Sequence, residues 1–278
     1  MVKTFKFKKM KCIGFLSKNV LIFVFFVLFN VKGFSENDHF FEESLKNESQ
    51  IEKKKIIILL IGPPGSGKGT QSEMISHKYK IPIISMGDIF RKEMRNETNL
   101  GKMLDFHKNS SSDFFPDQIA YGFIVKKLVD DNYQHGFILD GYPRTVEQSL
   151  VLLKLFEKTR DKFITIVFQL SDDILYKRID KRLICKNCIK QVREHENINE
   201  EEQICKICGS LLEKRENDLS ENAVSVRTMI YNDLKDGIIK SLEKYSEVNV
   251  LKLQNEDVYE VFEKIEKIIN LYLKDDNY

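Results

Sequence analysis

The chain has 278 residues, 42% of them apolar, which is enough for the core of one α/β domain with an insertion or at most two domains. Its net charge of +2 is uneven, because residues 1–35 contain seven lysines and no acidic residue or arginine, leaving 2 − 7 = −5 for the remainder. A mildly acidic body argues against a broad nucleic-acid-binding surface, so we expect no nucleic-acid partner.

The first 35 residues have the layout of a secretory signal peptide, with a basic start followed by the apolar run Val20–Phe29. That run is short for a membrane-spanning helix, which needs about 20 apolar residues. A longer stretch, Ile13–Phe34, could span the membrane if Lys18 is tolerated within the helix, so a signal anchor is the alternative. We expect the leader to direct the chain into the secretory route or an organelle reached through it, and to make any membrane contact. Residues 36–54 are polar and predicted to be a linker.

The apolar run Ile56–Ile61 is followed by a glycine-rich turn and then by helical spacing. The run is typical of a strand buried on both faces. Strand, glycine loop and helix start together predict a phosphate-binding loop, because backbone N–H groups and the helix dipole attract phosphate oxygens and Lys68 reaches the outer phosphates. The candidate triphosphate-binding residues here are Gly62, Gly65, Ser66, Gly67, Lys68, Gly69 and Thr70.

This loop departs from the general pattern, because the residue after Lys68 is Gly69 and the hydroxyl comes one position later, at Thr70. The usual Ser/Thr partner of magnesium is therefore missing from its slot. With that departure, GPPGSGKGTQ (62–71) resembles the phosphate loop of the adenylate kinase family, and the DGYPRT within Phe137–Thr145 is similar to that family's DGFPRT. The resemblance covers about residues 55–270. It implies an α/β, P-loop NTPase-type fold: a five-stranded parallel sheet flanked by helices, with a small zinc-ribbon-like lid insertion.

The segment after the phosphate loop resembles the family's monophosphate-binding region, about residues 85–115. Ile81–Ser85 is predicted to be a strand, and the following residues resemble the family's ISTGDxxR. The resemblance implies that Arg91 binds the monophosphate's phosphate and that Asp88 helps hold the water shell of Mg²⁺. Read alone, the two would be a surface arginine and a helix-capping aspartate. Met86 stands where the family has a hydroxyl, and a thioether cannot donate a hydrogen bond, so the contact to the monophosphate nucleoside is in doubt.

Residues 92–113 are predicted to be helical, and 119–129 to form an amphipathic helix. Between them, Phe114–Asp117 resembles the family's segment that closes over the base. Phe115 would pack on a purine face or serve as a hydrophobic plug, and the sequence leaves both open.

Phe137–Asp140 is predicted to be a buried strand, which puts Asp140 at a carboxyl end, where open parallel sheets bind ligands. The resemblance implies that Asp140 orients magnesium-bound water and that Arg144 contacts the transferred or accepting phosphate. It also implies that Gly141 lies at the monophosphate site and that Gln148 hydrogen-bonds the base through its amide.

Phe163–Leu170 is predicted to be a fourth strand, and Ser171 the N-cap of a helix that carries Arg178 and Arg182 on one face. The resemblance implies that this pair contacts the triphosphate.

Past the lid, Arg215 and Arg227 resemble the family's later arginines, which contact the monophosphate and the transferred group. The spacing at Arg215 is one residue longer than usual. Val248–Leu253 is predicted to be the fifth strand and Val258–Leu273 the closing helix. The loop between them lacks the family's glycine, so the choice of donor base is open.

Two Cys-x-x-Cys pairs flank sixteen residues. Such knuckles predict a closed, structural zinc site with four thiolates, and the resemblance places it in the lid, about residues 182–218. An oxidising route would favour disulfides instead. The predicted ligands are Cys185, Cys188, Cys205 and Cys208.

We therefore expect residues 55–278 to form a monomeric nucleoside monophosphate kinase domain. Its reaction would be reversible, Mg²⁺-dependent phosphoryl transfer from a nucleoside triphosphate, ATP favoured, to AMP. The alternatives are a GTP:AMP phosphotransferase and a catalytically weakened nucleotide-binding homologue. The long lid argues against a pyrimidine enzyme. The predicted catalytic residues are Lys68, Asp88, Asp140, Arg144, Arg178, Arg182, Arg215 and Arg227.

Overall fold

The computed structural model of the chain describes residues 55–109, 117–128, 133, 136–156, 162–185, 187, 190–192, 198–199, 204–205, 207–215 and 218–274. The leader predicted at 1–35, the linker at 36–54, Phe115 and Cys188 lie outside these ranges. Within the described part of the chain, no helix combines the length and apolarity needed to cross a membrane.

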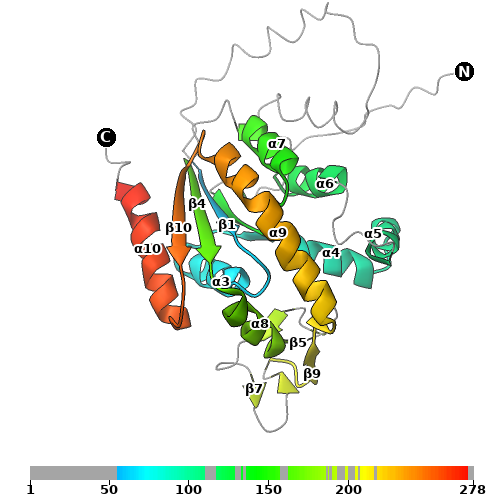
Figure 1. Cartoon of the computed structure of the whole chain (residues 1–278). Helices are drawn as coiled ribbons and strands as arrows, with labels where there is room; N and C mark the ends of the chain where they lie inside the picture. The colour runs from blue at the N-terminus through cyan, green and yellow to red at the C-terminus, as the bar shows by residue number, and fades with distance from the viewer. Residues whose placement is uncertain are drawn as a thin grey trace, which may run out of the picture.

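The central element is a five-stranded parallel sheet (Figure 1). Its strands stand in the order β10-β4-β1-β3-β2, with β1 innermost. Each strand pairs in parallel register with its neighbours, which confirms the predicted α/β fold with a five-stranded parallel sheet. The strands are β1 (Ile56–Ile61), β2 (Ile83–Ser85), β3 (Gly136–Asp140), β4 (Lys162–Gln169) and β10 (Glu247–Lys252).

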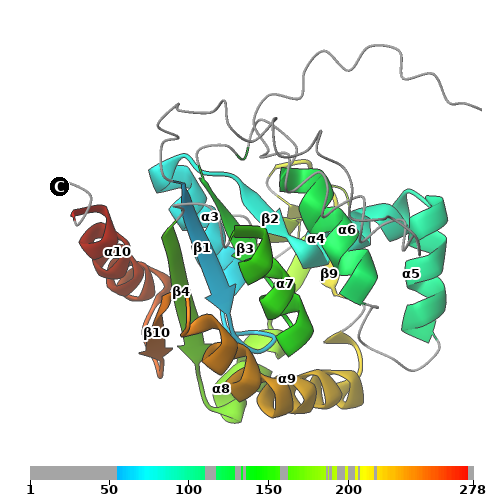
Figure 2. The same ribbon diagram turned by 90° about the horizontal axis from the view of Figure 1, so that it is seen from above.

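Helices cover both faces of the sheet because the strand side chains alternate between two apolar clusters. Ile58 and Leu60 of β1 pack in the cluster that contains α3 and α10, whereas Ile57 and Leu59 pack in the cluster on the opposite face (Figures 1 and 2). The helices of the first face are α3 (Lys68–Tyr79) and α10 (Val258–Lys274). Those of the second are α4 (Met86–Arg95), α5 (Asn99–Asn109), α6 (Asp117–Leu128), α7 (Val146–Phe156) and α9 (Glu221–Leu242).

The helix predicted over 92–113 is instead interrupted. The first helix, α4, ends at Arg95 and α5 begins at Asn99. Glu97 between them has a positive φ of 47°, which breaks the helical path. The Thr98 hydroxyl then accepts a hydrogen bond from the Gly101 N–H at 2.9 Å and so caps the second helix.

The predicted lid insertion forms small antiparallel sheets between α8 (Asp172–Asp180) and α9, at the lower end of the molecule in Figure 1. Leu183 pairs with Lys214 at the base of the insertion, so its two ends lie side by side. One sheet contains β5 (Leu183–Cys185), β6 (Lys190–Val192) and β9 (Leu212–Lys214), and the other contains β7 (Ile198–Asn199) and β8 (Ile204–Cys205).

Candidate active site

A cleft of about 1330 Å³ opens at the carboxyl ends of the parallel strands and runs under the lid. It is bounded by the phosphate loop, the start of α4, the end of β3, α8, the base of the lid and the loop after β10. All eight predicted catalytic residues line it, although they come from widely separated parts of the chain: Lys68, Asp88, Asp140, Arg144, Arg178, Arg182, Arg215 and Arg227.

The phosphate loop occupies the turn between β1 and α3. Gly65 and Gly67 have φ values of 78° and 93°, a conformation that favours glycine. A Cβ on Gly65 would lie 2.7 Å from the Ile179 side chain, so α8 packs directly against the loop. All seven predicted triphosphate-binding residues of the loop line the cleft, where the start of α3 offers its backbone N–H groups to an anion.

The side chain of Lys68 is hydrogen-bonded to the phosphate loop itself. Its Nζ donates hydrogen bonds to the carbonyls of Gly62 (2.7 Å) and Pro63 (2.8 Å) and to the hydroxyl of Ser66 (3.0 Å). Desolvation lowers the pKa of Lys68 to about 7, although the nearby Asp140 opposes this shift. An anionic ligand at the loop would favour the charged form of the amine.

Asp140 ends β3, as predicted, and its carboxylate faces the same part of the cleft. Burial is the main cause that raises its pKa, and Asp88 adds a like charge that acts in the same direction, while Lys68 lowers it. Asp140 and Asp88 both line the cleft beside the phosphate loop, and carboxylates so placed could hold the water shell of Mg²⁺.

Arg144 extends from the turn after β3, and its Nε donates to the Gly141 carbonyl at 2.8 Å. The side chain reaches the open cleft, yet its surroundings desolvate the guanidinium and, with the like charge of Arg227, lower its pKa to about 10. It therefore remains a cation at neutral pH and can bind an anion in the cleft.

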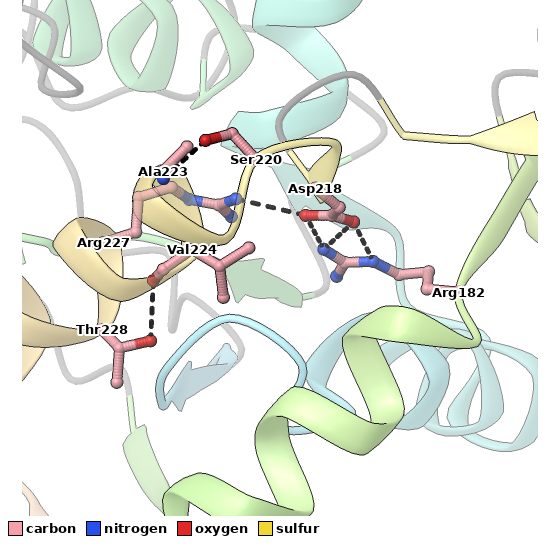
Figure 3. Close-up of polar contacts among 7 residues, drawn as sticks. All are labelled: Arg182, Asp218, Ser220, Ala223, Val224, Arg227 and Thr228. Carbon is pink, nitrogen blue, oxygen red and sulfur yellow. Dashed lines mark hydrogen bonds and ion pairs between the residues drawn. The ribbon is translucent and has the colours of Figure 1, made fainter.

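Arg182 and Arg227 share one buried carboxylate, that of Asp218 (Figure 3). The Nε and a terminal nitrogen of Arg182 donate to the two oxygens of Asp218 at 2.7 and 2.6 Å, and Arg227 donates to Asp218 at 3.3 Å. The Asp218 side chain is only 1% exposed. A bidentate pair of this kind fixes the guanidinium plane of Arg182 at the base of the lid.

The predicted pairing of Arg178 and Arg182 on one helical face is wrong, because α8 ends at Asp180. Arg178 lies within the helix, near the phosphate loop: a Cβ on Gly67 would be 3.8 Å from its guanidinium. Arg182 follows the helix and is held by Asp218 instead. Both still line the cleft.

Arg215 immediately follows β9, and Arg182 immediately precedes β5, so the β5–β9 pairing brings the two arginines to the same side of the cleft. Burial lowers the pKa of Arg215 well below its ordinary value, with added repulsion from Arg91, Arg182 and Arg227. Cations crowded in this way are stabilised by bound anions.

The start of α4 carries the predicted monophosphate residues. The Ser85 hydroxyl caps this helix by accepting from the Asp88 N–H at 3.4 Å. Arg91 donates to the Asp88 carboxylate, and both side chains line the cleft. Ser85, rather than Asp88, is therefore the capping residue.

Two other predicted monophosphate residues lie beside the cleft, not in its lining. Met86 is 1% exposed and Gln148 is 3% exposed, and both line a hollow of about 10 Å³ together with Gly141, Tyr142 and Arg144. The Met86 side chain packs in the apolar cluster around α4. Its predicted place in the monophosphate site remains a prediction.

Three of the predicted metal ligands meet in the lid. The Sγ atoms of Cys185, Cys205 and Cys208 all lie within 4.8 Å of one another, and the first two residues are buried. The Sγ atoms of Cys185 and Cys208 are 3.4 Å apart. This distance is longer than the roughly 2.05 Å S–S bond of a disulfide and near the separation of two thiolates bound to one tetrahedral ion. These donors fit a zinc ion.

Three carboxylates have roles that the sequence did not predict. Asp218 holds two arginines, Asp117 accepts from Thr145 and Gln148, and Glu256 accepts from Lys264. Asp218 lies three residues after the predicted site residue Arg215, and this proximity was the available signal. Nothing local to Asp117 or Glu256 indicates a partner, because their partners are distant in the sequence or depend on the loop conformation.

Comparison with known proteins identifies a family. A family model described as adenylate kinase matches residues 60–267. An adenylate kinase of Listeria innocua is 35% identical over 215 residues, covering 76% of this chain and 98% of the relative. An adenylate kinase of Lactococcus lactis is 34% identical over 219 residues (76% and 99%), and one of Methanosarcina barkeri is 35% identical over 217 residues (77% and 99%).

Proposed function

The chain belongs to the adenylate kinase family and is a nucleoside monophosphate kinase, and from that premise we propose that it transfers a phosphoryl group reversibly from a magnesium-bound nucleoside triphosphate, ATP favoured, to AMP. One observation carries the proposal: a phosphate loop with Lys68 opens into the same cleft as arginines from α4, α8, α9, the turn after β3 and the base of the lid. Cations on several sides of a cleft suit two phosphate-bearing ligands that meet end to end.

The reaction needs no nucleophilic side chain. An oxygen of the AMP phosphate attacks the terminal phosphorus of the donor, a new P–O bond forms, and the bond to the leaving diphosphate breaks. The protein contributes alignment and charge stabilisation. Lys68 and Arg178 hold the donor phosphates, Arg91 holds the acceptor phosphate, and Arg144 faces the group in transfer.

The metal supplies charge neutralisation between the donor phosphates when it is bound. Asp88 and Asp140 would hold its coordinated water molecules, in keeping with the preference of Mg²⁺ for water and carboxylate oxygen. Gly69 follows Lys68 in place of the usual hydroxyl residue, so these two carboxylates carry more of the task of orienting the metal.

We also propose a structural zinc ion in the lid, held by Cys185, Cys205 and Cys208 with Cys188 as the fourth ligand. The three described thiols support it by their convergence. Such an ion would order an insertion whose buried apolar cluster contains few residues.

GTP is the second candidate donor, and Glu256 is the observation that favours it. This residue lies in the loop after β10, which lines the cleft. Its two carboxylate oxygens accept from Lys264 at 2.5 Å and from the Gln254 N–H at 2.6 Å. A carboxylate can accept from the N1–H and amino group of guanine, whereas adenine presents a donor beside an acceptor.

Residues 1–35 are proposed to target the chain to the secretory route, or to an organelle reached through it, and the kinase domain is proposed to be a monomer. Sequencing the N-terminus of protein recovered from its own cells distinguishes a cleaved leader from a retained anchor. Light scattering on the purified protein measures the mass in solution.

The test of the proposed function is a coupled assay on the full chain with Mg²⁺. ATP, GTP and ITP are each paired with AMP, CMP, UMP and GMP. Transfer to AMP is expected, fastest with ATP, and a faster rate with GTP would identify the alternative donor. Nucleotide binding without transfer from any pair would mean that the chain is a binding protein, and would overturn the proposal.

A further inference from the structure

The first residue of α6 is hydrogen-bonded to the turn before α7 and to the first turn of that helix. One carboxylate oxygen of Asp117 accepts a hydrogen bond from Gln148 Nε2 at 2.7 Å, and the other accepts from the Thr145 hydroxyl at 3.0 Å. Asp117 is 28 residues from Thr145 and 31 from Gln148, so this bridge exists only in the folded chain. It joins two elements that border the small hollow beside the cleft.

The neighbours of Gln148 leave its side-chain amide one orientation. Its Oε1 accepts from the Arg144 backbone N–H at 2.7 Å, while its Nε2 donates to Asp117. A turned-over amide would set its NH₂ group against the Arg144 N–H and its oxygen against the carboxylate. Both contacts would then be repulsive, because a backbone N–H only donates and a carboxylate only accepts.

In this orientation each end of the amide keeps one unused capacity. The NH₂ group has two hydrogens and the oxygen has two lone pairs, and the contacts to Asp117 and Arg144 use one of each. The remaining donor and acceptor match the N1 acceptor and N6 amino group of adenine. They do not match hypoxanthine, whose N1–H donates and whose O6 accepts.

We propose that Asp117 is a positioning residue that fixes the amide of Gln148 and thereby makes the acceptor site select adenine over hypoxanthine. This inference rests on the proposed function, in which AMP is the acceptor. The hollow next to Gln148 holds only about 10 Å³, so the α4 side, with Met86 and Phe90, has to move away before a base can enter.

The experiment compares AMP and IMP as acceptors for the full-length protein at saturating donor. In Asp117→Ala the amide loses one of the two contacts that orient it, the one made by its NH₂ group. The ratio of kcat/KM for AMP to that for IMP is expected to fall by at least about tenfold, while the donor KM stays unchanged. Asp117→Asn can still present its oxygen to Gln148 and its NH₂ to the Thr145 hydroxyl, so it is expected to restore most of the ratio.

The matched control is Glu147→Gln, which removes a carboxylate from the exposed side of the same turn of α7 and is expected to leave the ratio unchanged. If Asp117→Ala does not fold, Asp117→Ser is the substitute, because serine suits the start of a helix but has only one side-chain oxygen in place of the two of the carboxylate. The same fall in the AMP-to-IMP ratio is expected.

An unchanged AMP-to-IMP ratio in a folded Asp117→Ala or Asp117→Ser variant would overturn the inference, even while the wild-type protein phosphorylates AMP. Absence of transfer in the wild type would overturn the proposed function instead. Equilibrium binding of AMP and IMP to the same variants would then still decide the role of Asp117.

Discussion

The guanidinium of Arg182 forms a bidentate pair with the carboxylate of Asp218, in which Nε and one terminal nitrogen donate to the two oxygens at 2.7 and 2.6 Å, and the side chains are 9% and 1% exposed. This contact joins the first residue of the lid to the segment that leaves it. Arg227 of α9 donates to the same carboxylate at 3.3 Å, so Asp218 holds two arginines that reach the cleft from different elements.

Replacing Asp218 with alanine should therefore harm both stability and transfer. The guanidiniums of Arg182 and Arg227, whose side chains are 9% and 18% exposed, lose this shared acceptor, which is expected to lower the free energy of unfolding by about 3 kcal/mol and kcat by at least tenfold. Urea unfolding and steady-state kinetics measure the two effects. Asp180→Asn is the matched control, because its carboxylate is 77% exposed and pairs with Lys214 at the surface. Equal behaviour of the two variants would contradict a special role for Asp218.

The lowered pKa of Lys68, about 7 in the protein without nucleotide, predicts proton uptake when the donor binds. Donor phosphates favour the charged amine, so the pKa in the complex is higher than in the free protein. At a pH between the pKa of Lys68 in the free protein and its pKa in the complex, the complex holds more protons than the free protein and donor. Donor affinity should therefore fall with rising pH, by up to about tenfold per pH unit above pH 7. Calorimetry at pH 7–9 in buffers of different ionisation enthalpy measures the uptake. Lys68→Met should lose this slope, and proton release on binding would refute the prediction.

Removing the charge of Arg144 should abolish most of the transfer while preserving the fold. We expect Arg144→Met to lower kcat by about a thousandfold, in line with other arginines that stabilise phosphoryl transfer. Thermal unfolding should be little changed, because this guanidinium makes its hydrogen bond to a neighbouring carbonyl rather than to a distant element. Lys154→Met, on the exposed side of α7, is the control. Turnover near the wild-type rate in Arg144→Met would be incompatible with the assigned role.

Met86→Thr should exchange stability for acceptor affinity. Met86 begins α4, is 1% exposed and packs in the apolar cluster on that face of the sheet, so truncating its side chain is expected to cost about 2 kcal/mol of unfolding free energy. The new hydroxyl can donate toward the hollow beside Gln148, and the KM for AMP should fall about three- to tenfold. An increase in that KM, measured at saturating donor, would show that the methionine itself favours the acceptor.

Purified full-length protein should contain one zinc ion per chain. Metal analysis measures the stoichiometry, and Cys205→Ser should lose the ion and make the lid sensitive to proteolysis. Cys12→Ser changes the cysteine outside the lid and should keep one zinc. If the purified protein contains no metal and its lid cysteines form two disulfides, the zinc site is wrong and the disulfide alternative is correct.

Local patterns determined much of this protein. The β-branched run, the glycines with positive φ and Lys68 are neighbours in the chain, so one short stretch carries the whole physical argument for a phosphate loop. The cysteine spacing likewise anticipated the convergence of three thiols, because knuckle geometry depends on only a few intervening residues. The five strands were predicted from apolar segments separated by helical ones, whereas their parallel arrangement in one sheet was implied by the family resemblance.

The tertiary structure decided which distant groups meet. Arg182 could not be separated from α8 by spacing alone, since the helix end and the contact to Asp218 depend on the return of the chain after the lid. The burial of Met86 and the orientation of the Gln148 amide depend on α4 and α6 packing beside β3 and α7. Side-chain contacts across tens of residues are set by packing of whole elements, and a local pattern contains no information about its partner.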